Sequence, residues 1–121
     1  MSDELYRKGV DYFNAGYFFE AHDTFEELWM DDRDASKRFY QGLVQLSTGC
    51  YHLVMKNVKG ARSQLSKSVA KLRGYEPAYM NLDVSELLRQ VEELLQRLPA
   101  EKIKDLSPEL LAAIPKIKLN Q

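Results

Sequence analysis

The apolar residues of this chain recur at intervals of three and four, which is the spacing of one face of an α-helix. Glycine and proline fall mainly where such helices would end, and no stretch alternates in the manner of a β-strand. The pattern predicts five to six helices, a loop over residues 75–82 and a tail after Pro115. The expected helices are Asp3–Asn14, Tyr17–Met30, Ala35–Lys56, Asn57–Arg73, Val84–Leu98 and a short one opened by Ser107, Pro108 and Glu109.

The ends of these helices carry the usual signals. Gly16 follows the first helix, Asp83 with Glu86 resembles a capping box, and Ser107 precedes a proline at the first helical position. The stretches Phe13–Ala21 and Lys59–Ala61 are similar to tetratricopeptide-type helical hairpins, although no repeat is regular enough for an array. The expected fold is therefore all-α, a compact irregular bundle with tetratricopeptide-like hairpins.

Size and composition describe a globular protein. With 121 residues, 45% of them hydrophobic and 29% charged, we expect one helical domain over residues 1–121, with a core at about 3–98 and a short helix and tail at 107–121. The lone Cys50 excludes an intrachain disulfide and lies in an apolar stretch, so we expect it to be buried.

The location and the class of partner are constrained by charge and hydropathy. The N-terminus is acidic and polar, and no apolar run approaches the roughly 20 residues that span a bilayer, so we expect a cytoplasmic protein without membrane contact. A net charge of -1 gives no overall attraction to nucleic acid, so we do not expect nucleic acid as a partner.

Charge is unevenly distributed along the chain. Residues 18–34 are rich in carboxylates, whereas residues 56–73 contain six lysines and arginines and no acid. Segments of opposite sign indicate contact within the fold or across a homo-oligomer. A basic helix could instead meet RNA or a phosphate, but this one has no aromatic interleaving, which favours a solvated face.

The second predicted helix places one histidine among phenylalanines and carboxylates. At about 100° per residue, His22 falls on the apolar face with Phe18 and Phe25, and Glu26 lies one turn further on. Side chains four apart could present a nitrogen and an oxygen to one divalent metal. Alternatively, the glutamate holds a neutral histidine in one tautomer, and the pair alone does not decide between these two interpretations.

The third predicted helix carries a second polar stripe. Its residues Gly42 and Gly49 run alongside that stripe, where another helix could approach closely. A short turn makes the second and third helices antiparallel neighbours, and a rise of about 1.5 Å per residue then puts Trp29 near Arg38 and His22 near Gln45. The combined cluster would be a structural polar network or a pocket for a small polar or anionic molecule: Glu20, His22, Glu26, Trp29, Arg38, Gln41, Gln45 and His52.

The motifs Tyr17–Trp29 and Gln41–Gln45, together with His52 and Asn57–Ala61, resemble a known family, Domain of Unknown Function 309. The family pattern is approximately Phe/Tyr-Glu-x-His-Glu-x-x-Glu-x-x-Trp, then Gln-Gly-Leu-Ile-Gln, then His with Gly-Asn-x-x-Gly-Ala. This chain departs from it with Asp23 in place of glutamate and with Lys56 in place of the glycine before Asn57.

The resemblance implies an all-helical protein of no established activity, and similar proteins are sometimes labelled predicted metal-dependent hydrolases. It points to the residues Glu20, His22, Glu26, Trp29, Gln41, Gln45 and His52.

Two hypotheses follow. The first is a small non-catalytic binding module with a protein partner or a second copy of itself. The alternative is a metal-dependent hydrolase acting on a small substrate, in which His22 and Glu26, with His52 or Glu20, hold the metal and Arg38 stabilises negative charge. Helix rise alone places His52 roughly 10 Å beyond the level of His22, which is a difficulty for a shared ion.

Overall fold

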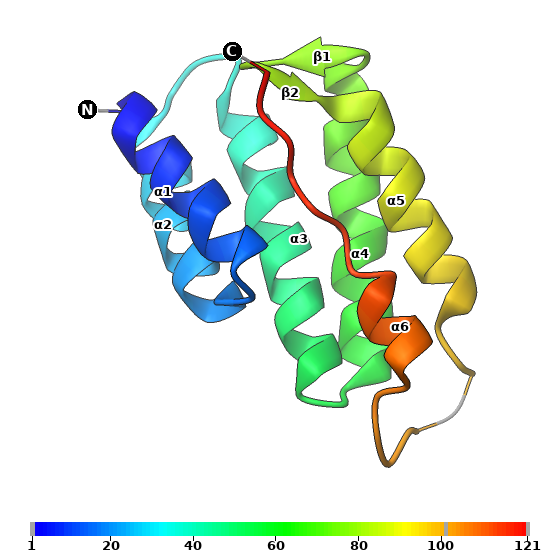
Figure 1. Cartoon of the computed structure of the whole chain (residues 1–121). Helices are drawn as coiled ribbons and strands as arrows, with labels where there is room; N and C mark the ends of the chain where they lie inside the picture. The colour runs from blue at the N-terminus through cyan, green and yellow to red at the C-terminus, as the bar shows by residue number, and fades with distance from the viewer. Residues whose placement is uncertain (1, 101, 121) are drawn as a thin grey trace.

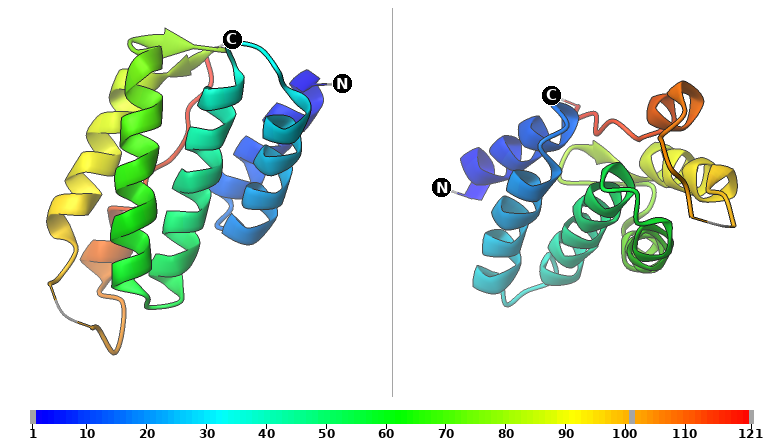
Figure 2. Two further views of the ribbon diagram at one scale, coloured as in Figure 1. Left: turned by 180° about the vertical axis from the view of Figure 1, so that it is seen from behind. Right: turned by 90° about the horizontal axis from the view of Figure 1, so that it is seen from below.

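The computed structural model describes residues 2–100 and 102–120, and its architecture is helical, as the sequence predicts (Figure 1). Helices α1 to α5 succeed one another as antiparallel neighbours, and α3 lies between α2 and α4 (Figure 2). Their bounds are α1 (Ser2–Asn14), α2 (Phe18–Asp31), α3 (Lys37–Val54), α4 (Val58–Leu72), α5 (Val84–Arg97) and α6 (Pro108–Ala112), with a 3-10 turn at Arg73–Tyr75.

The helix ends follow the capping signals in the sequence. The Asp83 side chain accepts a hydrogen bond from the backbone N–H of Glu86 at 3.0 Å, and the Ser107 hydroxyl accepts one from Leu110 at 3.1 Å. Gly16 adopts a φ of 87°, a left-handed conformation that glycine reaches without a steric penalty. These contacts satisfy backbone groups that a helix end would otherwise leave unpaired.

The expected loop at 75–82 contains a small hairpin, which the sequence prediction missed. Strand β1 (Ala78–Tyr79) pairs antiparallel with β2 (Leu82–Asp83). The two residues between them, Met80 and Asn81, have φ values of 48° and 62°, the positive values that a tight two-residue hairpin turn requires. Two-residue strands are too short to show alternation, so the hydropathy pattern could not reveal them.

Two glycines of α3 allow α4 to approach it closely. A Cβ placed on Gly42 would lie 2.9 Å from Leu72, and one placed on Gly49 would lie 2.7 Å from Leu65. Since real Cβ atoms do not come so near, only glycine allows this spacing. The close neighbour predicted beside the polar stripe of α3 is therefore α4.

The core runs through all the long helices. Cys50 is fully buried in it, as expected, and burial raises the pKa of its thiol. Within the part of the chain that the structure describes, no helix is both long and apolar enough to cross a membrane.

After α6 the chain runs back as an extended segment, residues 114–120, which we call the tail. It passes from α6 towards the hairpin (Figure 1) and contacts α1 through Asn14 and α5 through Gln90. Leu119 forms an antiparallel bridge with Leu82, and Ile117 is buried. The tail thus adds an extended element to the free edge of β2.

Candidate functional site

His22 lies at the edge of the buried face of α2 and not inside it, so the sequence prediction of a core histidine is wrong. Its side chain is 29% exposed, whereas Thr24 is 8% exposed as a whole residue. The Thr24 hydroxyl donates to the carbonyl of Glu20 at 2.8 Å, which satisfies it without a distant partner. Positions 22 and 24 flank the same apolar stripe, and the neighbouring helices cover the side of Thr24.

The structure does bring His22 and Glu26 together, one helical turn apart. The imidazole Nε2 lies 3.7 Å from a Glu26 carboxylate oxygen, and Nδ1 lies 3.1 Å from an Asp23 oxygen. The two carboxylates therefore stand beside opposite nitrogens of one ring. This arrangement fixes the ring orientation, but the two carboxylates and one ring nitrogen do not converge on a common point.

A divalent metal does not fit this arrangement. Structural and catalytic zinc sites take at least three protein ligands around one ion. Across residues 2–100 and 102–120, no group of three or more histidine, cysteine, aspartate or glutamate side chains is placed to hold a metal.

The other members of the predicted cluster have separate partners. The Gln45 side-chain oxygen accepts a hydrogen bond from Lys71 of α4 at 3.2 Å, and the ammonium of Lys37, not Arg38, lies 5.2 Å from the centre of the Trp29 ring. Glu20 and Arg38 are exposed and Gln41 is half-buried. Burial, followed by repulsion from Arg38 and Lys67, lowers the pKa of Lys71. The polar stripe of α3 thus contacts α4, and the expected approach of His22 to Gln45 is not among the described contacts.

The His52 side chain, on α3, contacts the N-cap residue of α4, Asn57. Its ring nitrogen lies 3.4 Å from the Asn57 amide, and the Asn57 oxygen accepts a hydrogen bond from the backbone N–H of Gly60 at 2.9 Å. A Cβ on Gly60 would lie 2.6 Å from the Asn57 side-chain nitrogen and 3.0 Å from the His52 ring, which accounts for glycine there. Lys56, where the family pattern has glycine, has a φ of 66°, a left-handed conformation in which glycine is less strained. These residues of the motif have a structural role.

Two aromatic side chains, those of Phe19 and Tyr51, lie between His22 and His52 on the surface of α2 and α3. The Phe19 ring centre lies 6.1 Å from that of His22 and 5.7 Å from that of Tyr51, which in turn is 6.3 Å from that of His52. Phe19 is 49% exposed. The histidines are therefore separated by an aromatic row, which the sequence prediction did not include.

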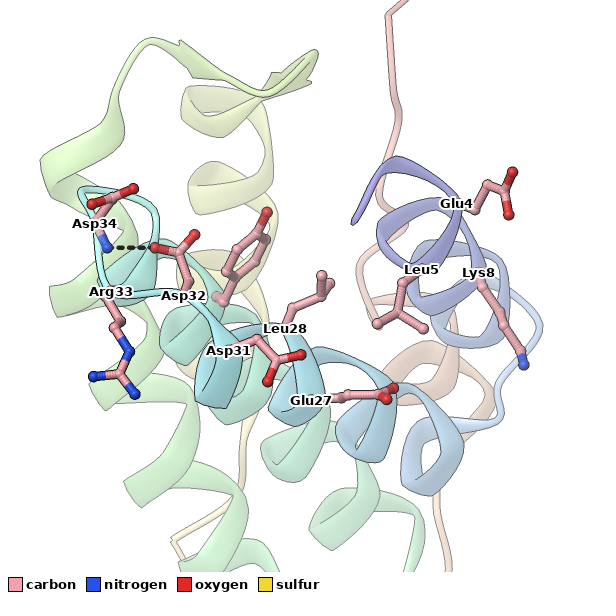
Figure 3. Close-up of a pocket in the computed structure, with 10 residues that line it drawn as sticks. Glu4, Leu5, Lys8, Glu27, Leu28, Asp31, Asp32, Arg33 and Asp34 are labelled. Atoms are coloured by element: carbon pink, nitrogen blue, oxygen red, sulfur yellow. Dashed lines mark hydrogen bonds between the residues drawn. The ribbon is translucent and has the colours of Figure 1, made fainter. Parts of the chain in front are cut away.

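A cavity lies between α1, α2 and the α2–α3 connection (Figure 3). Its volume is about 860 Å³, and five carboxylates and two cations contribute to its lining. Leu5 and Leu28 point towards each other between the two helices (Figure 3). We call it the acidic cavity, and it is lined by Glu4, Leu5, Lys8, Glu27, Leu28, Asp31, Asp32, Arg33, Asp34 and Tyr40.

The carboxylates of the acidic cavity carry charge that the fold does not neutralise. None of the five forms an ion pair with another described residue. Lys8 lies instead over the Tyr12 ring at 5.7 Å. Nor does any ion pair between described residues join the acidic segment 18–34 to the basic segment 56–73, since α3 separates α2 from α4. The predicted attraction within the fold is therefore absent from these contacts.

Comparison with known proteins places these motifs in a family. The family model "Domain of unknown function (DUF309)" matches residues 6–64, from α1 into the first turns of α4. The "Uncharacterized protein YpuF" of Bacillus subtilis (strain 168) is 28% identical over 99 residues, which cover 77% of this chain. The chain spans only a little over half of that relative, 57% of its length. Both the motifs and this match relate residues 6–64, just under half of the chain, to the DUF309 family.

Proposed function

We propose that this chain is a non-catalytic helical module that binds a basic segment of a partner protein in the acidic cavity. The observation that supports the proposal is the lining, which has five carboxylates against two cations and no internal ion pair among the described residues. Its volume of about 860 Å³ is of the size that binding pockets in proteins usually have. Lysine and arginine side chains from a peptide would supply the missing charge.

The chemistry of the lining favours binding over catalysis. No histidine, cysteine or serine lines the acidic cavity, so it lacks a hydroxyl or thiol nucleophile paired with an imidazole base. Tyr40 donates its hydroxyl proton to the Met80 sulfur at 3.4 Å, and burial, followed by repulsion from Asp32, raises its pKa. The tyrosine is therefore held in its neutral form.

The proposal is tested with a fluorescent peptide of alternating lysine and glycine residues. We expect the parent to bind it at low salt, with an affinity that falls as salt is added, because exposed charges are screened. The double variant Asp31→Asn with Asp34→Asn should bind at least about tenfold more weakly, which corresponds to about 1.4 kcal/mol.

The matched control carries the same change of net charge elsewhere. Asp11→Asn with Glu109→Gln alters two exposed carboxylates outside the acidic cavity and should leave binding within about twofold of the parent. An equal loss of peptide affinity in both double variants would show that binding depends only on net charge. Failure of the parent to bind at low salt would reject the proposal.

Metal-dependent hydrolysis is the alternative that the sequence suggests, although the carboxylates beside the His22 ring do not converge on one point. Elemental analysis of untagged protein, purified without chelator, tests it beside the Glu26→Gln variant. We expect less than stoichiometric zinc, manganese and iron in both proteins. Near-stoichiometric metal in the parent, lost in the variant while the helical circular-dichroism signal persists, would favour the hydrolase and justify a substrate screen.

A further inference from the structure

The tail is held in its groove mainly through its backbone. The Asn14 side chain donates to the carbonyl of Ile117 at 2.7 Å and accepts from the backbone N–H of the same residue at 2.8 Å. The Gln90 oxygen of α5 accepts from the backbone N–H of Lys116 at 3.0 Å. One amide thus pairs with both backbone groups of a residue, as a neighbouring β-strand would.

The edge of the hairpin completes this backbone recognition. Leu119 bridges Leu82, and the backbone N–H of Asn120 donates to the carbonyl of Asn81 at 2.6 Å. Addition of an extended segment to a free strand edge is a recurring mode of peptide recognition. Because such hydrogen bonds involve only main-chain groups, they would serve any extended segment that fits the groove.

The side chains of the tail alternate as in a half-buried strand. Pro115 and Ile117 are buried and Leu119 is half-buried, whereas Lys116 and Lys118 are exposed. Ile117 is only 3% exposed and forms the centre of this apolar face. Alternation with a period of two is the pattern by which a groove selects an extended ligand.

The tail fills the far end of this groove incompletely. A cavity of about 130 Å³ lies beside Leu119, lined also by Asp3, Tyr6, Arg7, Met80 and Asn81. Tyr6 is 4% exposed, and its buried hydroxyl has no hydrogen-bond partner among the described residues. An unsatisfied buried hydroxyl is unfavourable, so the tail is an imperfect ligand for its own groove.

From these contacts we infer that the groove between α1, α5 and the hairpin is a docking site for an extended segment of another protein, and that the tail occupies it as an intramolecular competitor. The partner segment has apolar residues at alternate positions, matching 115, 117 and 119, and an exposed basic residue between them. This site lies apart from the acidic cavity, because the two share no lining residue. The docking proposal can therefore be tested independently of the proposed function.

The test uses the full chain and a labelled peptide with the sequence of residues 113–120, Ala-Ile-Pro-Lys-Ile-Lys-Leu-Asn. Ile117→Asp places a carboxylate at a buried position and should release the tail. We expect the variant to bind the peptide at least about tenfold more tightly than the parent, because the parent's tethered tail competes at a high effective concentration. Lys118→Ser, at an exposed tail position, should leave the parent's weak binding unchanged.

Two further measurements separate docking from unfolding. Adding Asn14→Leu to Ile117→Asp removes both side-chain bonds to the peptide backbone and should weaken binding about tenfold. Hydrogen exchange of the parent should show amides 116, 117 and 120 exchanging much faster than those of α3, because the tail opens without global unfolding.

Three results would overturn the proposal. The first is a folded Ile117→Asp chain that does not bind the peptide. The second is protection of the tail amides equal to that of α3. The third is a parent dimer in which mixed isotopic labelling shows the tails exchanged between copies, since the occupant would then be a second copy and not another protein.

Discussion

Helices α2 and α5 are both amphipathic and both acidic, yet their carboxylates differ in their ion-pair partners. On α5, Arg89 pairs with Glu86 at 2.8 Å and with Glu93 at 3.0 Å, and Arg97 pairs with Glu93 at 3.1 Å. On α2 the only cationic partner in the described ion pairs is His22, which has to be protonated to carry charge. The carboxylates of α5 are paired with its own arginines and, for Glu92, with Arg73, whereas α2 leaves negative charge facing solvent and the acidic cavity.

The same contrast appears where the two helices begin. Asp83 caps α5 through its side chain, whereas Tyr17 at the start of α2 forms no such bond. α5 is thus stabilised by contacts within and just before the helix. α2 depends more on its buried face, where Phe25 is fully enclosed and packs so closely on α1 that a Cβ on Gly9 would lie 2.6 Å from its ring. Helix α2 can therefore leave the carboxylates of its outer face unpaired, because its buried face holds it in place.

The largest expected effect comes from removing that inner contact. Phe25→Ala should lower the free energy of unfolding by about 3 to 5 kcal/mol, because it deletes a buried aromatic ring and leaves a cavity. Chemical denaturation monitored by circular dichroism measures it. Glu27→Gln, at an exposed position of the same helix, is the control. A loss below about 1 kcal/mol would mean that α2 does not depend on its buried face.

The next effect concerns the cap of α5. Asp83→Ala should cost about 1 kcal/mol of unfolding free energy, because the N–H of Glu86 loses its acceptor. Tyr17→Ala, at the start of α2, has no capping bond to lose, although it removes an aromatic contact with Tyr12. To separate these contributions, Asp83→Asn is measured beside Asp83→Ala and should recover most of the loss. Equal stability of the asparagine and alanine variants would show that the cap contributes nothing.

The third effect is a dependence on pH. Hydrogen bonds from Arg89 lower the pKa of Glu86, and those from Arg97 lower the pKa of Glu93, below the ordinary value of 4.5. Because both folded pKa values are depressed, the stabilisation is present above about pH 4.5 and is lost as the pH falls through the lower folded values. Thermal unfolding between pH 6 and pH 3 should show a smaller decline for Glu93→Gln than for the parent. Equal declines in the melting temperature of the two proteins would show that Glu93 does not contribute to the loss of stability in acid.

The smallest expected effect is on the free energy of unfolding, which a Glu→Gln substitution should raise on α2 and lower on α5. Glu27 lies four residues from both Asp23 and Asp31, so Glu27→Gln should stabilise the fold by about 0.2 to 0.5 kcal/mol for each repulsion removed. Glu93→Gln loses its pairs with Arg89 and Arg97 and should destabilise it. Denaturation at low salt measures both, and the difference should shrink as salt is added. The same sign for both variants would contradict the comparison.

The fold could be predicted because local rules and burial agree along most of the chain. The apolar stripe of α5 and the caps at Asp83 and Ser107 fixed helix positions to within a residue or two. The hairpin could not be predicted, because its register depends on a turn at Met80 and Asn81 that has no glycine to mark it. Tertiary packing imposes those positive φ values.

The candidate site was harder to predict, because a helical wheel gives angles and not neighbours. It places positions 22 and 24 at the two margins of one stripe, and only the packing of α1 and α3 decides which margin is covered. The sequence predicts that the polar stripe of α3 faces α2, but Gln45 contacts α4 and His52 contacts its N-cap, Asn57. Helix α4 approaches α3 at Gly42 and Gly49. The groove of the tail depends on the pairing of Asn14 with Ile117, 103 residues apart, which no local pattern reveals.

The position of the tail in the sequence also sets an order of events during translation. Synthesis runs from the N-terminus, so α1, α5 and the hairpin all leave the ribosome before residues 114–120. At about 5 to 20 residues per second, Gln90, the last residue of the groove, is synthesised roughly one to five seconds before the tail. An extended segment bound during that interval would meet no intramolecular competitor, whereas one that meets the finished protein would have to displace the tail.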